Sequence, residues 1–187
     1  MLDIFSQFLS FLELIQNCLS ETTQVNAESL EHILFTQPGM RYCQAQALVH
    51  SLMKDSLFAS SSEVERKLAI NKILEDVRGR MMEEIVPLET SKSLPRTKRA
   101  FKLLLSRGEF DMVIYDSETN TCELYEIKHS RQIVPEQYHV LLDEERCIET
   151  ERRFGKITKR SVIYCGEDYK TKDNIRYQNV ENYLNSL

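Results

Sequence analysis

Three charged side chains interrupt the apolar sequence between Glu109 and Ser130, where the residue types otherwise favour β-strands. Asp111 falls in the first apolar run, and Glu126 and Lys128 fall two positions apart in the second. Because side chains alternate across a strand, Glu126 and Lys128 share one face and stand about 7 Å apart. If the two runs pair as a hairpin, Asp111 can lie beside Glu126 or near it.

The chemistry open to these side chains follows from their charges. Two carboxylates in close reach repel each other unless a cation lies between them, and carboxylate oxygens with water are ligands that Mg²⁺ prefers. A lysine ammonium can stabilise a developing oxyanion or hold a phosphate. The pattern therefore predicts a site for Mg²⁺ or Mn²⁺ at Asp111 and Glu126, beside Lys128. A salt-bridge cluster that only stabilises the strands would show the same pattern.

The elements that must position this site are indicated by a change of hydrophobic period after about residue 90. Polar turn residues at 116–121 join the two runs as a hairpin. An apolar stripe of Val64, Leu68 and later residues predicts a long helix before them, from Glu63 to about Leu88, with Gly79 inside it. The order of helices and strands predicts an α/β domain with a mixed sheet. Its strands are expected at 100–105, 109–115, 122–128, 160–165 and 175–178, and its later helices at 137–153 and 180–187.

Residues 1–61 have apolar side chains that recur at three- and four-residue steps, a pattern typical of helices. We expect a wholly helical segment there. It begins with an amphipathic helix over 1–20 and a short helix capped by Asn26, and a third helix follows a break at 37–39 and ends near Phe58. Three such helices suit a winged-helix unit or a plain helical packing bundle. We therefore predict a helical segment over 1–60 and an α/β domain over 61–187.

The spacing D-x(14)-E-x-K on a hairpin after a long helix resembles the PD-(D/E)XK nuclease superfamily. The resemblance implies a restriction-endonuclease-like fold, in which helices flank the mixed sheet, and metal-dependent hydrolysis of DNA or RNA. It also implies an acidic residue on the preceding helix, which the segment GRMMEEIV (79–86) would supply. The family pattern selects Glu83, whereas helical geometry places Glu84 on the apolar stripe. We expect Glu83, because a bend at Gly79 could rotate the last turns of the helix.

A closer resemblance is carried by the segments RGEFDMVIYD, CELYEIKHS, QYHVLLDEE, RRFGKITKRSVIYCGED and IRYQNVENYL. Together they look like the C-terminal domain of predicted prokaryotic AAA-type ATPases of unknown function. In that family an ATPase module and a winged-helix segment precede a nuclease-like tail, so an ATPase module is implied in a longer relative. The Gly-Lys pair at Gly155-Lys156 has Thr150 where the phosphate-binding motif needs glycine. We therefore do not expect this chain to bind ATP.

Basic residues near the expected strands are candidates for contact with nucleic acid. One group precedes the first strand and a second surrounds the fourth; they are Lys92, Arg96, Lys98 and Arg99, and then Arg152, Arg153, Lys156, Lys159 and Arg160. A solvated basic surface would explain either group equally well. His129 is a candidate for proton transfer, and Gln137, expected to open a helix, resembles a glutamine that some nucleases of this superfamily place near the site.

Composition narrows the remaining classes. The net charge is −5, with six acidic and two basic residues in 1–61, which argues against a strong general affinity for nucleic acid. No apolar run reaches the roughly 18 residues of a membrane helix, so no membrane partner is expected. Five cysteines without C-x-x-C spacing favour reduced thiols in a cytoplasmic protein, without zinc or disulfides.

The functional prediction from sequence is a magnesium-dependent nuclease-like domain that acts on DNA or RNA. Asp111 and Glu126 would hold the metal, Glu83 would complete or orient its ligand shell, and Lys128 would stabilise the transition state or help to activate water. The alternative is a catalytically inactive module of the same fold that binds nucleic acid or protein or mediates oligomerisation, for example as a homodimer. DNA binding through residues 1–61 is a third hypothesis.

Overall fold

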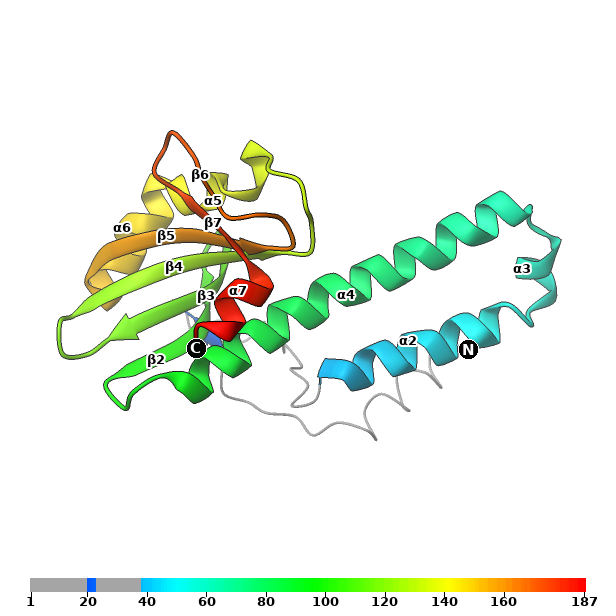
Figure 1. Cartoon of the computed structure of the whole chain (residues 1–187), viewed down its shortest axis with the longest axis horizontal. Coiled ribbons are helices and arrows are strands. Elements are labelled where there is room, and N and C mark those ends of the chain that lie inside the picture. Colours follow the sequence, from blue (N-terminus) through cyan, green and yellow to red (C-terminus); the bar gives the residue numbers. More distant parts are fainter. Residues whose placement is uncertain (1–19, 23–37) are drawn as a thin grey trace.

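The computed structural model describes residues 20–22 and 38–187, and it consists of a sheet flanked by helices with a helical hairpin beside it (Figure 1). The described strands are β1 (Ser20–Thr22), β2 (Lys98–Leu105), β3 (Gly108–Asp116), β4 (Thr121–Lys128), β5 (Lys156–Tyr164), β6 (Tyr169–Lys170) and β7 (Arg176–Asn179). The described helices are α2 (Pro38–Leu52), α3 (Ser56–Ser60), α4 (Glu63–Ser93), α5 (His139–Leu142), α6 (Glu144–Phe154) and α7 (Val180–Asn185), with a 3₁₀ helix η1 (Pro135–Gln137).

The strands form one mixed sheet in the order β1-β2-β3-β4-β5-β7-β6. Neighbouring strands are antiparallel from β2 to β4, and β5 is parallel to both of its neighbours, β4 and β7. β1 runs parallel to β2, and β6 runs antiparallel to β7. The sheet confirms the predicted α/β class, and the hairpin of β3 and β4 is the one predicted over the 116–121 turn.

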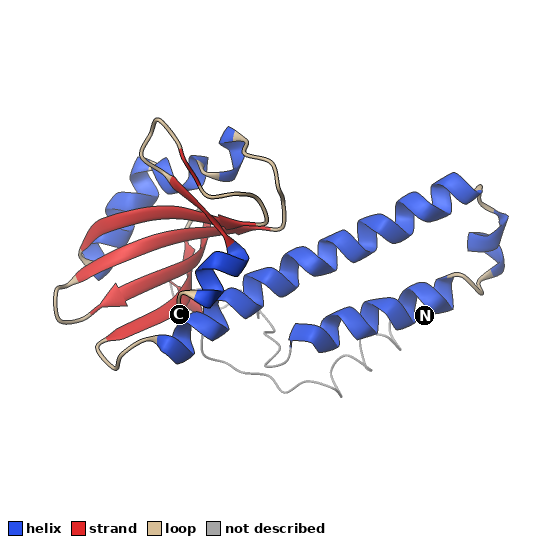
Figure 2. Ribbon diagram, in the orientation of Figure 1, coloured by secondary structure: helices blue, strands red, loops and turns tan. Residues whose placement is uncertain are grey.

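Helices cover both faces of the sheet (Figure 2). On one face α6 contributes Cys147 and Phe154 to a buried cluster that includes Leu124 of β4. On the other face α4 contributes Val86 to a cluster that includes Tyr125, the next residue of β4. Successive residues of β4 therefore face different cores, as strand alternation requires.

The long helix α4 begins at a capping box. The Ser62 hydroxyl accepts the Glu65 N–H, and the Glu65 carboxylate accepts the Ser62 N–H, which satisfies two otherwise unpaired donors. The helix spans 31 residues and runs past the predicted end near Leu88, with Pro87 inside it. Because proline has no N–H, the carbonyl of Glu83, four residues earlier, lacks its helical hydrogen bond.

The first half of α4 packs beside α2 rather than on the sheet (Figure 1). Val64 and Leu68, assigned to its buried stripe from sequence, are instead 77% and 69% exposed. The stripe prediction is wrong there because this part of the helix projects away from the sheet and, among the described elements, packs beside α2.

The N-terminal third departs from a wholly helical segment. Ser20–Thr22 forms strand β1, which pairs with β2, and a three-residue strand leaves no local pattern to recognise. The expected third helix is in fact two helices, because the Asp55 carboxylate accepts the N–H groups of Leu57 and Phe58 and starts α3. α2 begins at Pro38, within the expected break. The helix expected at Asn26 lies outside the described residues, as does that over 1–20 except for its last residue.

The helix expected at 137–153 is also divided, into η1, α5 and α6. Asp143 starts α6 by accepting the Arg146 N–H at 3.0 Å. Gln137 ends η1 and does not open a long helix. In the part of the chain that the structure describes, no helix is both long enough and apolar enough to cross a membrane.

Candidate functional site

Asp111 of β3 and Glu126 and Lys128 of β4 meet at one point. Lys128 Nζ lies 3.2 Å from Asp111 Oδ2 and 2.9 Å from Glu126 Oε2. Each acidic residue is only 5% exposed, whereas a third of the lysine side chain reaches solvent. We call these three residues the acid–lysine cluster; it consists of two buried carboxyl groups with one ammonium between them.

A β-bulge in β3 aims the first of these acids. The register of β2 against β3 shifts between Phe101 and Leu103, so that Asp111 and Met112 together stand opposite Lys102. A bulge bends its strand and changes the direction of the side chains on it. The bulge therefore explains how an acid in the middle of a buried strand can reach toward β4.

Asp111 also takes the role of a backbone acceptor. The ladder between β3 and β4 pairs Met112 with Tyr125, and beyond that pair the Ile127 N–H donates to Asp111 Oδ2 at 2.8 Å. A buried N–H must find an acceptor, and here a carboxylate supplies it. This hydrogen bond fixes the Asp111 carboxylate where the ladder ends.

The charge of the cluster depends on the protonation of Glu126. Burial, and next the negative charge of Asp111, raise the pKa of Glu126 to about 8, although Lys128 opposes that rise. Burial would lower the pKa of Lys128, but the two carboxyl groups together raise it above its ordinary value. At neutral pH the lysine is therefore charged, while Glu126 holds a proton in much of the population.

The two consecutive acids of α4 have different surroundings. Glu83 is half-buried, and burial followed by the charge of Asp111 raises its pKa, against the influence of nearby lysines. Glu84 is buried and forms an ion pair with Arg41 of α2. Burial raises the pKa of Glu84, and Arg41 opposes that rise. Glu83 is thus the acid of α4 that acts electrostatically on Asp111, whereas Glu84 is committed to the helical hairpin.

Lys102 is a neighbour of the site that was not identified from sequence. It stands opposite the bulge and forms an ion pair with Glu109 at 2.6 Å. Its charge lowers the pKa of both Glu83 and Glu84. The signal was present, because a lysine interrupts the apolar run AFKLLL in the same way as Asp111 interrupts the next strand.

Two other candidates contact residues outside the acid–lysine cluster. His129 Nδ1 lies 3.2 Å from Glu75 Oε2 on α4. Gln137 accepts a hydrogen bond from the Tyr177 hydroxyl and donates one to the Ser130 hydroxyl, both at 3.2 Å. The first contact joins the residues after β4 to α4, and the other two join η1 to β7 and to Ser130, so each side chain has a structural role.

The basic residues 92–99 lie toward the other end of β2. Lys98 pairs with Asp116 at 3.6 Å, four residues before Lys102, and therefore roughly 13 Å from the bulge along the strand. Lys92 pairs with Glu89 at 2.7 Å. The structure thus separates Lys92 and Lys98 from the acid–lysine cluster. Arg96 lies in the connection between α4 and β2, and Arg99 lies in β2 over the rings of Phe101 and Tyr115.

Whether the acid–lysine cluster can hold a metal ion depends on its donor groups. Among residues 20–22 and 38–187, no three His, Cys, Asp or Glu side chains lie close enough together to hold a metal ion. Asp111 and Glu126 nevertheless suit Mg²⁺ in kind, because this ion is often bound by one or two carboxylates with water completing its shell. The buried carboxyl groups require a positive charge, which the ammonium of Lys128 supplies in this structure.

Comparison with known proteins adds no relative. A scan against models of protein families gives no match, and a search among curated proteins finds no similar sequence. The fold and the site therefore define the protein only as a mixed α/β protein with a buried acid–lysine cluster.

Proposed function

We propose that this chain is a metal-dependent phosphodiesterase of nuclease type, built on a restriction-endonuclease-like arrangement of α4, β2–β5 and α6. The observation that carries the proposal is the acid–lysine cluster, in which two buried carboxyl groups from adjacent strands converge on one partly exposed ammonium. Burying such charged groups costs free energy unless a charge of opposite sign or a bound metal ion compensates them. In enzymes, residues with strongly shifted pKa values are concentrated at active sites.

Each residue has a separate role in this proposal. Asp111 and Glu126 would hold Mg²⁺ or Mn²⁺, which supplies charge neutralisation and a more acidic bound water when present. Asp111 is held in place by the Ile127 N–H, so its carboxylate needs little rearrangement. Lys128 would donate to a non-bridging oxygen of the phosphate as negative charge develops there. Glu83, whose pKa is raised by burial and by Asp111, would orient water or accept a proton.

A cleavage assay tests the proposal. The full chain would be incubated with plasmid DNA, single-stranded DNA and RNA, each with Mg²⁺, Mn²⁺ or EDTA. We expect cleavage that depends on the metal and that falls about 100-fold or more in Asp111→Asn and Lys128→Ala, the scale for loss of one transition-state contact. Lys67→Ala removes an exposed lysine from the far half of α4 and is the matched control, expected to keep full activity.

Two results would reject this proposal. Cleavage that persists unchanged in Lys128→Ala would come from another protein in the sample. Complete inactivity, together with absence of Mg²⁺ binding by calorimetry, would favour a non-catalytic module. A specific observation supports that second function, since Lys128 already contacts both carboxyl groups, as in a closed salt-bridge cluster. A cytoplasmic location stays a prediction, as does the division of the chain into a helical segment over 1–60 and an α/β domain over 61–187.

A further inference from the structure

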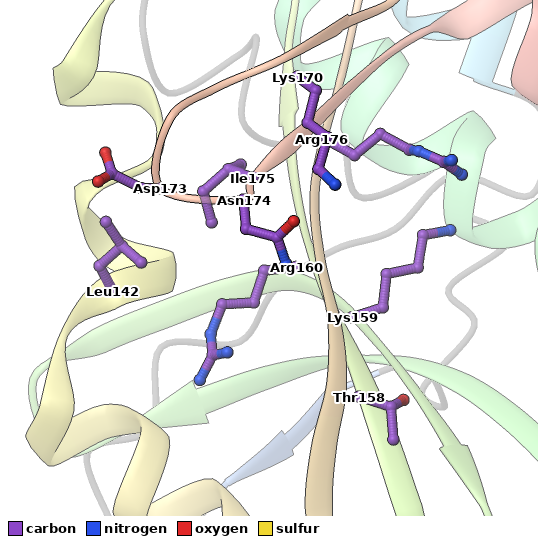
Figure 3. Close-up of a pocket in the computed structure, with 9 residues that line it drawn as sticks. All are labelled: Leu142, Thr158, Lys159, Arg160, Lys170, Asp173, Asn174, Ile175 and Arg176. Carbon is purple, nitrogen blue, oxygen red and sulfur yellow. The ribbon is translucent and has the colours of Figure 1, made fainter.

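A basic hollow lies on the side of β5 that is opposite to β4, the strand that carries Glu126 and Lys128. It has a volume of about 240 Å³ and opens among β5, β6, β7 and the loop 171–175 (Figure 3). Its basic lining consists of Lys159, Arg160, Lys170 and Arg176, and we call it the basic hollow. Asp173 is the one acidic residue among the described residues that line it. The lining therefore has a clear excess of positive charge.

The local acid does not neutralise this charge. Asp173 Oδ2 accepts a hydrogen bond from the Tyr138 hydroxyl at 3.4 Å, and its carboxylate points away from Lys159 and Arg176 (Figure 3). In the described part of the chain, Lys170 and Arg176 have neither an ion pair nor a side-chain hydrogen bond. Arg160 differs, because its Nη2 donates to Cys147 Sγ on α6 at 3.7 Å and its side chain extends away from Lys159 and Arg176 (Figure 3). The unused donors of Lys170 and Arg176 are therefore available to a ligand.

Lys159 shows that the cations act on one another. Its Nζ donates to the Tyr125 hydroxyl at 2.9 Å and lies 3.7 Å from Glu123 Oε2. Burial lowers the pKa of Lys159, and Arg176 adds to that effect although Glu123 opposes it. Figure 3 shows the side chains of Lys159 and Arg176 extending in the same direction from β5 and β7. Two like charges held side by side gain from an anion placed between or beside them.

The size and chemistry of the hollow select the anion. Pockets for drug-sized ligands usually have volumes of about 300–1,000 Å³, so 240 Å³ suits one small group better than a whole ligand of that size. Arginine offers a planar fork of donors that matches phosphate oxygens, and lysine adds a point charge. A carboxylate would use fewer of these donors. The hollow is therefore better matched to a phosphate group.

We propose that the basic hollow binds a phosphate group of a ligand, through Arg176 and Lys170 with support from Lys159. The ligand is either a nucleic-acid strand or a small phosphorylated molecule, since both present the same group. The inference does not depend on the acid–lysine cluster, and it holds whether or not that cluster is catalytic.

The test uses the full chain in EDTA, so that no metal at the acid–lysine cluster contributes. Binding of inorganic pyrophosphate would be measured by NMR titration for the wild type and for Arg176→Gln, Lys170→Gln and the double variant. We expect about a tenfold loss of affinity for each single variant, the scale of one charge-assisted hydrogen bond. Lys172→Gln is the control, because it removes the same charge from an exposed position two residues from Lys170 and outside the lining. It should change affinity less than twofold.

A labelled single-stranded decanucleotide distinguishes the two sources of phosphate. If Arg176→Gln weakens it as well and reduces the dependence of log K on log salt by about 0.7, a strand contacts the hollow. If only pyrophosphate binding is weakened, the ligand is a small phosphorylated molecule. Absence of saturable pyrophosphate binding to the wild type would overturn the proposal, as would an equal loss in Lys172→Gln. Unchanged urea midpoints would show that the exposed variants remain folded.

Discussion

The raised pKa of Glu126 makes stability depend on pH in a direction that can be measured. Its pKa rises from 4.5 to about 8 on folding, first because of burial and next because of Asp111. The folded state therefore binds more protons than the unfolded state between pH 4.5 and 8, and the free energy of unfolding must fall as pH rises through that window. This contribution to stability is fully present below pH 4.5, is lost progressively as pH rises, and is absent above pH 8.

The size of the effect follows from the same shift. At about 1.36 kcal/mol for each pH unit, the loss of stability between pH 5 and pH 8.5 is on the order of 4 kcal/mol. Burial would lower the pKa of Lys128, but Asp111 and Glu126 together raise it. Lys128 therefore loses its proton only above this pH window. Glu83 and Glu84 shift in the same direction as Glu126, so the wild-type curve alone does not isolate one group.

Glu126→Gln isolates it, because the amide keeps the shape of the side chain and does not titrate. We would measure urea unfolding of the wild type and the variant at half-unit steps from pH 5 to pH 9 in EDTA. The wild type should lose stability relative to the variant as pH rises, by a few kcal/mol in total, so the two curves converge or cross. Curves that stay parallel over the whole range would refute the assignment of a high pKa to Glu126.

Three further predictions concern the framework, each read from urea unfolding. Gly79→Ala should stabilise the protein by about 0.5–1 kcal/mol, because the added Cβ makes only an ordinary contact at 4.0 Å inside a helix; a loss would mean that close packing requires the glycine. Arg41→Ala should destabilise by roughly 3 kcal/mol, because it leaves Glu84 buried without its partner; restored stability in the double variant with Glu84→Gln would support this cause, and no restoration would contradict it. Gly155→Ala should destabilise by about 3 kcal/mol or more, because φ is +73° and a Cβ would lie 1.8 Å from the Asn120 carbonyl oxygen; a neutral result would mean that this loop adjusts freely.

The strands around the site could be predicted because their patterning is strong. Each charged interruption in the hairpin stood out against apolar neighbours, and alternation then placed Glu126 and Lys128 on one face. The bulge at Asp111 could not be predicted in the same way. No glycine marks it, and it exists only through the register of β2 against β3. The direction of Asp111 is therefore a tertiary property.

The helical elements were predicted less well, for two different reasons. α4 continues through Pro87 and past its predicted end near Leu88, because packing of Val86 against the sheet core holds the helix together there. Asp143 was a recognisable cap that the apolar pattern at 137–153 hid, and it divides the expected helix. In the first case tertiary burial overrode local preference, and in the second a local signal was given too little weight.

The pair of acids at Glu83 and Glu84 shows how the helical hairpin influences the site. Consecutive residues on a helix point about 100° apart, so the two carboxyl groups cannot both approach Asp111. Arg41 of α2 binds Glu84 and compensates its buried charge. Glu83 is left to act on Asp111, with its own pKa raised by burial and by that aspartate. A division of the chain at residue 60 would separate Arg41 from Glu84 and leave a buried, uncompensated carboxyl group one residue from the candidate site. The hairpin is therefore part of the electrostatic environment in which the acid–lysine cluster titrates.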